Sequence, residues 1–369
     1  YKENMKKNIL TATLLAMPLM FFTACSDFLD TAPDNRIEIN NTDQITPLLV
    51  SAYPNKSAAL MGEMSSDNVM DNGAQFDAML LQEQLYNWED PTDTDDDGPY
   101  GLWESCYAAI ASANQALEGI EMLGNPANLN PQRGEALVCR AYSHFLLSSI
   151  FCMPYNPNTA DQQLGIPYTK ETEKDVIVPH ERGTLAQTYK LIEEDIKEGL
   201  PLITDASYKV PKYHFNKKAA NAFAARFYLY YQKWDKVIEH ATAAIGNNPA
   251  NTLRHWEEDF GSLSLVSDVA AQYISEKKTA NLLISTAYSS AGYVTGPYSI
   301  YQRFGHGQEI YNKETINVNG PWHARGGLVM ADFIISVKQK NPFPKIVTYF
   351  EYTDKASQIG YRHTVSVPF

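Results

Sequence analysis

An acidic segment in the first third of the chain has the residue types and spacing of a calcium-binding loop. Counted from its first acid, carboxylates stand at positions one, three, five and twelve and a glycine at six, namely Asp93, Asp95, Asp97, Glu104 and Gly98. Twelve-residue calcium loops take their oxygen ligands from these positions, and the glycine allows the sharp turn. The pattern therefore predicts a candidate structural calcium site.

A simpler interpretation of the same acids stays open. The dipole of a helix favours negative side chains at its N-terminus, so the segment also fits a solvated loop that leads into a helix. Pro91 and Pro99 weigh against the calcium pattern.

Patterns typical of catalysis are missing from the sequence. It has no Gly-x-Ser-x-Gly, no His-Glu-x-x-His and no phosphate-binding loop, and Gly305-His-Gly307 lacks the third glycine of a dinucleotide fingerprint. The acidic runs 193–195 and 257–259 place their carboxylates on different sides of a helix, whereas glycoside hydrolysis needs two that flank a sugar. We therefore expect a protein that is not an enzyme and that requires no cofactor.

Aromatic side chains are the other candidates for ligand contact. The chain has 23 Tyr, 15 Phe and 5 Trp, and a sugar or peptide can stack on a flat aromatic face while nearby polar groups fix its orientation. Aromatics at helical spacing are expected in the core: Trp103, Tyr107, Tyr189 and Tyr228. Aromatics in loop-rich segments are the candidate ligand platforms: Trp88, Tyr288, Tyr298, Tyr301 and Trp322. The alternative for each is packing within its own subdomain.

The first 24 residues have the layout of a lipoprotein signal peptide, with a few residues upstream of Met5. Lys6 and Lys7 precede an apolar run that is too short to span a bilayer, and small residues stand directly before Cys25. We expect Cys25 to become the lipidated first residue of an anchored protein, with several acyl chains for stable attachment. The other three cysteines lack metal-ligand spacing and are interpreted as small buried hydrophobes: Cys106, Cys139 and Cys152.

The elements that must position these residues are expected to be helices in pairs. Residues 214–249 are predicted to form two helices, each with one apolar face, that meet near Trp234. The second helix ends before Pro249. Small residues fall where the tetratricopeptide pattern needs close helix approach, and the layout of residues 136–142 repeats that of residues 222–228. Further helices are expected at 42–53, 76–88, 103–123, 131–151, 184–203 and 262–277. The predicted fold is mainly α, a tetratricopeptide-like superhelix of helical pairs.

Beyond about residue 254 the sequence pattern changes to short strand-like runs, such as Asn281–Ala287, separated by Gly and Pro. We expect a loop-rich mixed α/β subdomain over 254–369, after a helical scaffold over 25–253.

The net charge of −13 argues against a nucleic-acid partner, since no basic stripe is present to neutralise phosphates.

Several short motifs in fixed order resemble the SusD/RagB family of Bacteroidetes outer-membrane lipoproteins. They are Cys25–Pro33, Trp103-x-x-x-Tyr107 with Ile110 and Asn114, Glu135-Ala136 with Arg140-Ala141-Tyr142, Leu164–Tyr168, Arg182-x-Thr184 with Asp195, and Lys218–Ala220 with Arg226-x-Tyr228. The resemblance covers residues 25 to about 245. It implies a surface lipoprotein that binds an oligosaccharide, or sometimes a peptide, and delivers it to a partner TonB-dependent transporter of the SusC type.

The resemblance also implies a further helical block after the loop-rich part, which is expected to be missing here. A scaffold or adhesion lipoprotein that uses its helical pairs to bind protein stays open as the alternative function. Such helical-pair scaffolds are usually binding platforms.

Overall fold

The computed structural model describes residues 39, 41–76, 78–173, 178–260, 262, 266–291, 302–305, 328–329 and 334–335. The signal segment, Cys25 and three of the candidate platforms, Tyr298, Tyr301 and Trp322, lie outside these residues. The main part that is described belongs to one compact unit that begins at Asn41.

A short helical stretch opens the described part: η2 (Thr42–Gln44), α3 (Ile45–Leu49) and η3 (Val50–Ala52). Asn41 caps it, because its side chain accepts from Asp43 N–H while the Gln44 side chain accepts from Asn41 N–H. The next helix is α4 (Ala59–Met64). The apolar residues Leu60, Met61 and Met64 account for it, since all three are buried.

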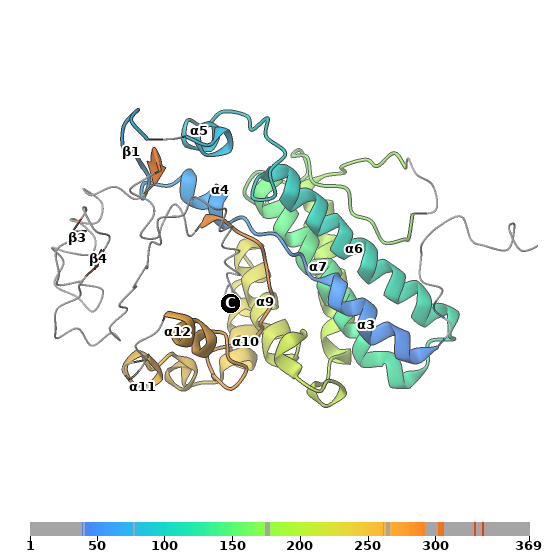
Figure 1. The fold of residues 1–369 in the computed structure, drawn as a ribbon. Helices are drawn as coiled ribbons and strands as arrows, with labels where there is room; N and C mark the ends of the chain where they lie inside the picture. Colours follow the sequence, from blue (N-terminus) through green and yellow to red (C-terminus); the bar gives the residue numbers. More distant parts are fainter. Residues whose placement is uncertain are drawn as a thin grey trace, which may run out of the picture. The chain divides into compact units, whose positions relative to one another are not determined.

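Four helices then form the scaffold, and Figure 1 shows the long pair α6 and α7 side by side. They are α5 (Leu80–Tyr86), α6 (Pro99–Met122), α7 (Asn130–Phe151) and α8 (Leu185–Gly199), with η4 (Ala127–Leu129) and η5 (Leu200–Leu202) at the turns. Helices α7 and α8 approach closely, because a Cβ on Gly134 would lie 2.6 Å from the backbone oxygen of Gly199. The helices expected at 103–123, 131–151 and 184–203 are therefore present, and α6 begins earlier, at Pro99.

The tetratricopeptide-like pair consists of α9 (Lys217–Tyr230) and α10 (Trp234–Ile245), preceded by η6 (Asp205–Ser207) and η7 (Pro211–Tyr213). Helix α9 buries small and aromatic residues against α7 and α10, including Phe223 and Phe227. The apolar stripe predicted for α10 is only partly covered, since Ala244 is buried whereas Trp234 is 59% and Ile238 67% exposed. Helix α10 packs mainly on α9 and buries only His240 and Ala244, so its other side has no described helix over it.

The chain beyond α10 returns across the scaffold through η8 (Pro249–Thr252), α11 (Trp256–Phe260) and α12 (Val266–Tyr273). The strand expected over Asn281–Ala287 is not formed. Its backbone groups bond instead with the loop before α9, where Asn216 Nδ2 donates to Leu282 O at 2.7 Å and Ile284 N–H to Lys212 O at 2.7 Å. The domain boundary at 253/254 stays a prediction.

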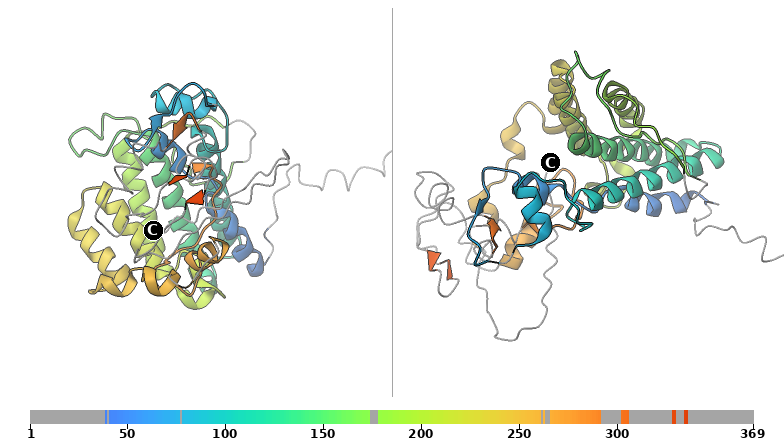
Figure 2. Two further views of the ribbon diagram at one scale, coloured as in Figure 1. Left: turned by 60° about the vertical axis from the view of Figure 1, so that its left-hand side comes forward. Right: turned by 90° about the horizontal axis from the view of Figure 1, so that it is seen from above.

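Two very short antiparallel sheets are described: β1 (Met70–Asp71) with β2 (Phe304–Gly305), and β3 (Leu328–Val329) with β4 (Ile334–Ile335). In the first, Met70 lies opposite Gly305 and Asp71 opposite Phe304. Figure 2 shows β1 and α5 from two further sides. The pairing of β1 with β2 brings together residues that lie far apart in the sequence.

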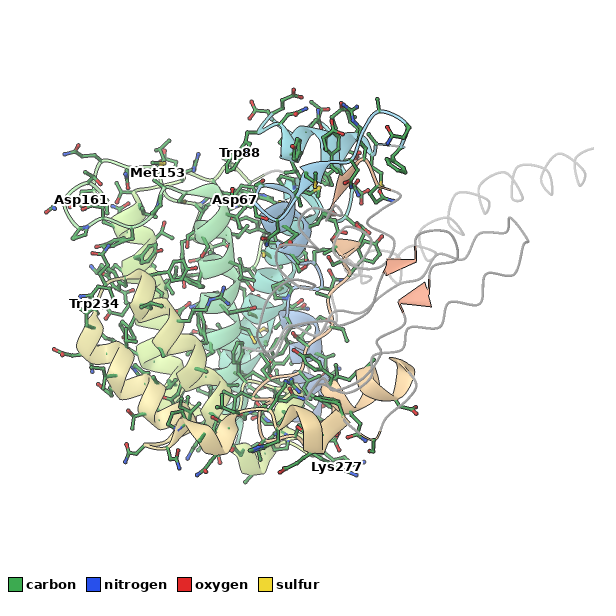
Figure 3. The ribbon with its side chains drawn as sticks, turned by 90° about the vertical axis from the view of Figure 1, so that its left-hand side faces the viewer. Asp67, Trp88, Met153, Asp161, Trp234 and Lys277 are labelled. Atoms are coloured by element: carbon green, nitrogen blue, oxygen red, sulfur yellow. The ribbon has the colours of Figure 1, made fainter. Side chains whose placement is uncertain are left out.

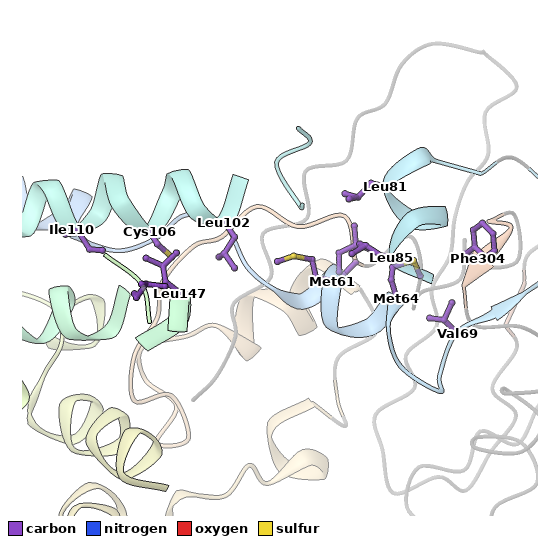
Figure 4. Close-up of a cluster of buried hydrophobic side chains, with 13 residues drawn as sticks. Met61, Met64, Val69, Leu81, Leu85, Leu102, Cys106, Ile110, Leu147 and Phe304 are labelled. Carbon is purple, nitrogen blue, oxygen red and sulfur yellow. The ribbon is translucent and has the colours of Figure 1, made fainter. Parts of the chain in front are cut away.

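One apolar cluster links this edge to the helices. It contains Met61, Met64, Leu85, Leu102, Cys106 and Phe304, with others from α4 to α7 (Figure 4). Cys106 and Cys139 are free and buried, as expected from the sequence, and Cys152 is half-buried. Within the described residues no helix has both the length and the apolar content needed to cross a membrane.

Candidate ligand-binding surface

Trp88 is the most exposed of the large hydrophobic side chains in the described part, at 79% (Figure 3). It follows the last turn of α5 with a φ of +58°, where its N–H donates to Leu85 O at 3.2 Å and the next N–H, of Glu89, to Gln84 O at 2.8 Å. Glycine usually fills such a left-handed helix end, because a Cβ there costs about 1 kcal/mol. An exposed indole in a strained backbone position marks a candidate functional residue.

The acidic loop runs from Glu89 to Gly98 and directly follows Trp88. Gln84 of α5 holds its start, because the amide nitrogen donates to Thr92 Oγ1 at 2.9 Å and the amide oxygen accepts from Thr92 N–H at 3.0 Å. Further along, Asp93 Oδ1 accepts from Asp95 N–H at 3.1 Å. The loop is thus an ordered turn structure built partly by its own carboxylates.

The end of this loop contacts a distant segment through Asp97. The Asp97 side chain is 1% exposed, its Oδ2 accepts from Ser290 N–H, and its Oδ1 has no partner among the described residues. Burial raises the pKa of this carboxyl above its usual value, although hydrogen bonds from Ser290 and Ser289 oppose the shift. Asp97 therefore joins the acidic loop to residues 288–291.

The predicted calcium ligands are not gathered in this structure. Asp97 points to Ser290, and Glu104 is exposed on α6, beyond its first turn. Across the residues that the structure describes, no group of three or more His, Cys, Asp or Glu side chains is arranged to hold a metal ion. Calcium binding by Asp93, Asp95, Asp97 and Glu104 stays a prediction that a thermal-stability measurement can test.

Tyr288 lies where the loop ends. Its N–H donates to Asn55 O at 2.8 Å, and Lys56 Nζ lies 4.8 Å from the centre of its ring. The same Lys56 Nζ is 2.6 Å from Asp96 Oδ2. Trp88 and Tyr288 therefore stand at the two ends of one acidic loop, and one face of the Tyr288 ring is partly covered by an ammonium group.

The sequence did not indicate Lys56, Ser289 or Ser290 as members of this surface. Lysine and serine in polar segments have no periodic signal, and the pairing joins residues some 190 positions apart, since Ser290 and Asp97 are separated by 193. The aromatics expected in the core behave as predicted where they lie on helix faces: Tyr189 is 2% and Tyr228 1% exposed. Trp103 and Tyr107 are half-buried and contact each other at 5.0 Å between ring centres.

A second polar feature lies at the other end of α6 and α7. A cavity of about 500 Å³ opens over a buried ion pair in which Arg140 Nε and Nη2 each lie 2.7 Å from an oxygen of Asp195. Asn114 accepts from Arg140 Nη1 at 2.9 Å and donates to the backbone oxygens of Thr169 and Glu171. Because these groups satisfy one another, we interpret the network as a structural connection between α6, α7 and α8.

Residues 27–229 match the family model SusD-like_3, described as starch-binding and associating with the outer membrane. The chain is 29% identical over 172 residues to SusD-like protein P2 of Formosa agariphila, which covers 46% of this chain and 31% of that protein.

Two solved structures share the fold. A Bacteroides vulgatus structure matches with a TM-score of 0.54 and 19% identity, over 75% of this chain and 62% of its own. A SusD superfamily protein of Bacteroides thetaiotaomicron matches with a TM-score of 0.52 and 13% identity, over 75% of this chain and 63% of its own. The chain thus spans less than two thirds of the length of each of these relatives. At these identities the two structures show the fold alone, and they confirm the mainly helical, tetratricopeptide-like class.

Proposed function

Since the chain belongs to the SusD-like family, we propose that it is a cell-surface lipoprotein of the outer membrane that binds an oligosaccharide, or a peptide, as a nutrient. In this proposal Cys25 carries the lipid anchor, and the bound ligand passes to a partner TonB-dependent transporter of the SusC type. The protein binds its ligand without turning it over. No nucleic acid is a partner.

Trp88 is the observation that supports ligand binding most directly. An indole that is 79% exposed is buried only to a small extent in the free protein, yet the chain keeps it in a backbone conformation that glycine would adopt at lower cost. A sugar ring that stacks on the exposed face of the indole would bury that face, which the folded protein alone leaves in solvent. Tyr288, Tyr298, Tyr301 and Trp322 remain the other proposed platforms.

The second candidate function is a scaffold that binds protein. It is favoured by two apolar residues one turn apart on α10, Trp234 and Ile238, which are 59% and 67% exposed. A helix that shows an apolar stripe to solvent is typical of one that docks a partner helix.

Isothermal titration with malto-, laminari- and xylo-oligosaccharides and with short peptides tests the first function. We expect at least one ligand to bind, and Trp88→Ala to weaken that binding about tenfold or more, as for a central aromatic contact. The matched control is Trp234→Ala, which removes an exposed indole from α10 and leaves the affinity unchanged.

The outcomes separate the candidates. No binding of any oligosaccharide or peptide contradicts the nutrient-binding function, and an equal effect of the two Trp variants contradicts the role of Trp88. Release of shorter sugars during the titration would indicate an enzyme instead.

A further inference from the structure

The chain segment that follows Trp88 carries one sign of charge. Between Trp88 and Trp103 the sequence has six acidic residues, at 89, 90, 93, 95, 96 and 97, and no Lys, Arg or His. Glu89 and Asp90 follow the indole directly and are exposed. Because successive Cα atoms are about 3.8 Å apart, the Asp90 Cα lies within about 8 Å of the Trp88 Cα.

Within the loop, the structure describes an ion pair and a buried carboxyl only at the far end. Lys56 pairs with Asp96 at 2.6 Å, and Asp97 is buried against Ser290. The carboxylates of Asp93 and Asp95 accept from backbone N–H groups of the loop itself, which order it without cancelling its charge. The negative charge is therefore concentrated beside Trp88.

The acidic loop follows Trp88 in the chain, and its far end contacts the segment of Tyr288. Trp88 precedes the loop, and Tyr288 lies at its end against Lys56. A ligand that stacks on Trp88 lies beside the start of this loop, where Glu89 and Asp90 are exposed. Stacking on an aromatic face does not depend on the charge of a sugar's substituents, so the loop decides which charge the ligand can carry.

We propose that this surface selects uncharged glycans and rejects glycans that carry sulfate or carboxylate groups, with Glu89 and Asp90 as the specificity-determining residues. This inference rests on the proposed nutrient-binding function. A pair of like charges about 8 Å apart in water changes an affinity by roughly twofold, and several pairs multiply. We expect an uncharged oligosaccharide to bind about tenfold more tightly than its sulfated form at low salt, because screening is weak there.

The test uses an oligosaccharide that binds the protein in the titration panel and the sulfated form of the same oligosaccharide. Both are titrated in buffer with chelator, at ionic strengths of about 0.03 M and about 0.5 M, because the Debye length falls severalfold between them. The Glu89→Gln/Asp90→Asn double variant removes two charges beside Trp88. The matched control, Asp235→Asn/Glu239→Gln, removes two exposed charges from α10.

For the wild type we expect the affinity for the neutral form to exceed that for the sulfated form about tenfold at low salt, and by a smaller factor at high salt. In the Glu89/Asp90 variant we expect this ratio to fall below about three at low salt, whereas the control variant keeps the wild-type ratio. Equal affinities for the two forms, or tighter binding of the sulfated form, would overturn the inference while leaving ligand binding itself established. The inference is also overturned if the control variant lowers the ratio as much as the Glu89/Asp90 variant. Should neither form bind, the proposed function fails and the inference fails with it.

Discussion

Individual residues inside the helices show how polar groups are kept in a buried network. His144 is fully buried, and its Nε2 accepts from Thr169 N–H at 3.2 Å, so its Nδ1 carries the proton and donates to Arg140 O at 2.8 Å. Its ring stacks on Tyr168, whose hydroxyl donates to Asp195 Oδ2 at 2.6 Å. The imidazole is thus held neutral between two helices and a loop.

Burial lowers the pKa of His144 to about 3, and the nearby charges of Arg140 and Lys170 act in the same direction. The unfolded chain, with a His pKa near about 6.5, binds the proton more readily, so this group stabilises the folded state above that pH and progressively less as the pH falls toward 3. The slope from one such group is at most about 1.4 kcal/mol per pH unit.

We therefore predict that His144→Gln lowers stability most at neutral pH and that its deficit shrinks between pH 6.5 and pH 4. Chemical denaturation of wild type and variant at matched pH values measures this difference, and all other titrating groups cancel in the comparison. A deficit that does not change with pH would contradict a buried neutral imidazole.

At the scale of elements, periodic segments could be predicted and contacts between distant loops could not. The spacing of apolar residues located α6, α7, α8 and α9 because each buries one continuous face. The same pattern located α10 but gave the wrong environment for Trp234 and Ile238, since periodicity says which residues share a face and not what covers it. The irregular course of residues 281–287 depends on Asn216, which no local pattern indicates.

The sequence also predicted one part of the candidate surface and missed another. Trp88 and the acidic loop were identified from residue type and turn-forming neighbours. The left-handed conformation of Trp88 could not be predicted from residue type, because glycine usually takes that place at a helix end. The burial of Asp97 could not be predicted either, because it results from contact with Ser290, 193 positions away.

The acidic loop carries the calcium prediction. Binding of calcium to the folded state alone would stabilise it by about 2.7 kcal/mol when the ion is in hundredfold excess over its dissociation constant. We expect the melting temperature to rise in millimolar calcium and to fall on addition of chelator, with a smaller rise in Glu104→Gln. Identical melting of both proteins in both conditions would leave a solvated acidic loop as the interpretation.

At the scale of the whole molecule, attachment to the membrane is proposed to rest on one residue. We predict that Cys25→Ala releases the protein from membranes to the soluble fraction, because acyl chains on that sulfur are the proposed anchor. Fractionation followed by detergent extraction measures this, with Cys152→Ala as the control, since Cys152 is a half-buried free thiol of the scaffold. Full retention of the Cys25 variant in the outer membrane would contradict lipid anchoring at this position.

The pairing of β1 with β2 has a consequence for the order in which the chain folds. Next to it, Asn72 Nδ2 donates to Gln302 O across 230 positions, and closing so long a loop is slow compared with forming neighbouring helices. The hairpins of α6 to α10 rely on contacts between successive elements and can assemble before residue 304 has been synthesised. Until then β1 has an unpaired edge and Tyr86 lacks the Phe304 ring that stacks on it at 4.6 Å. This edge is therefore open to wrong association in the nascent chain.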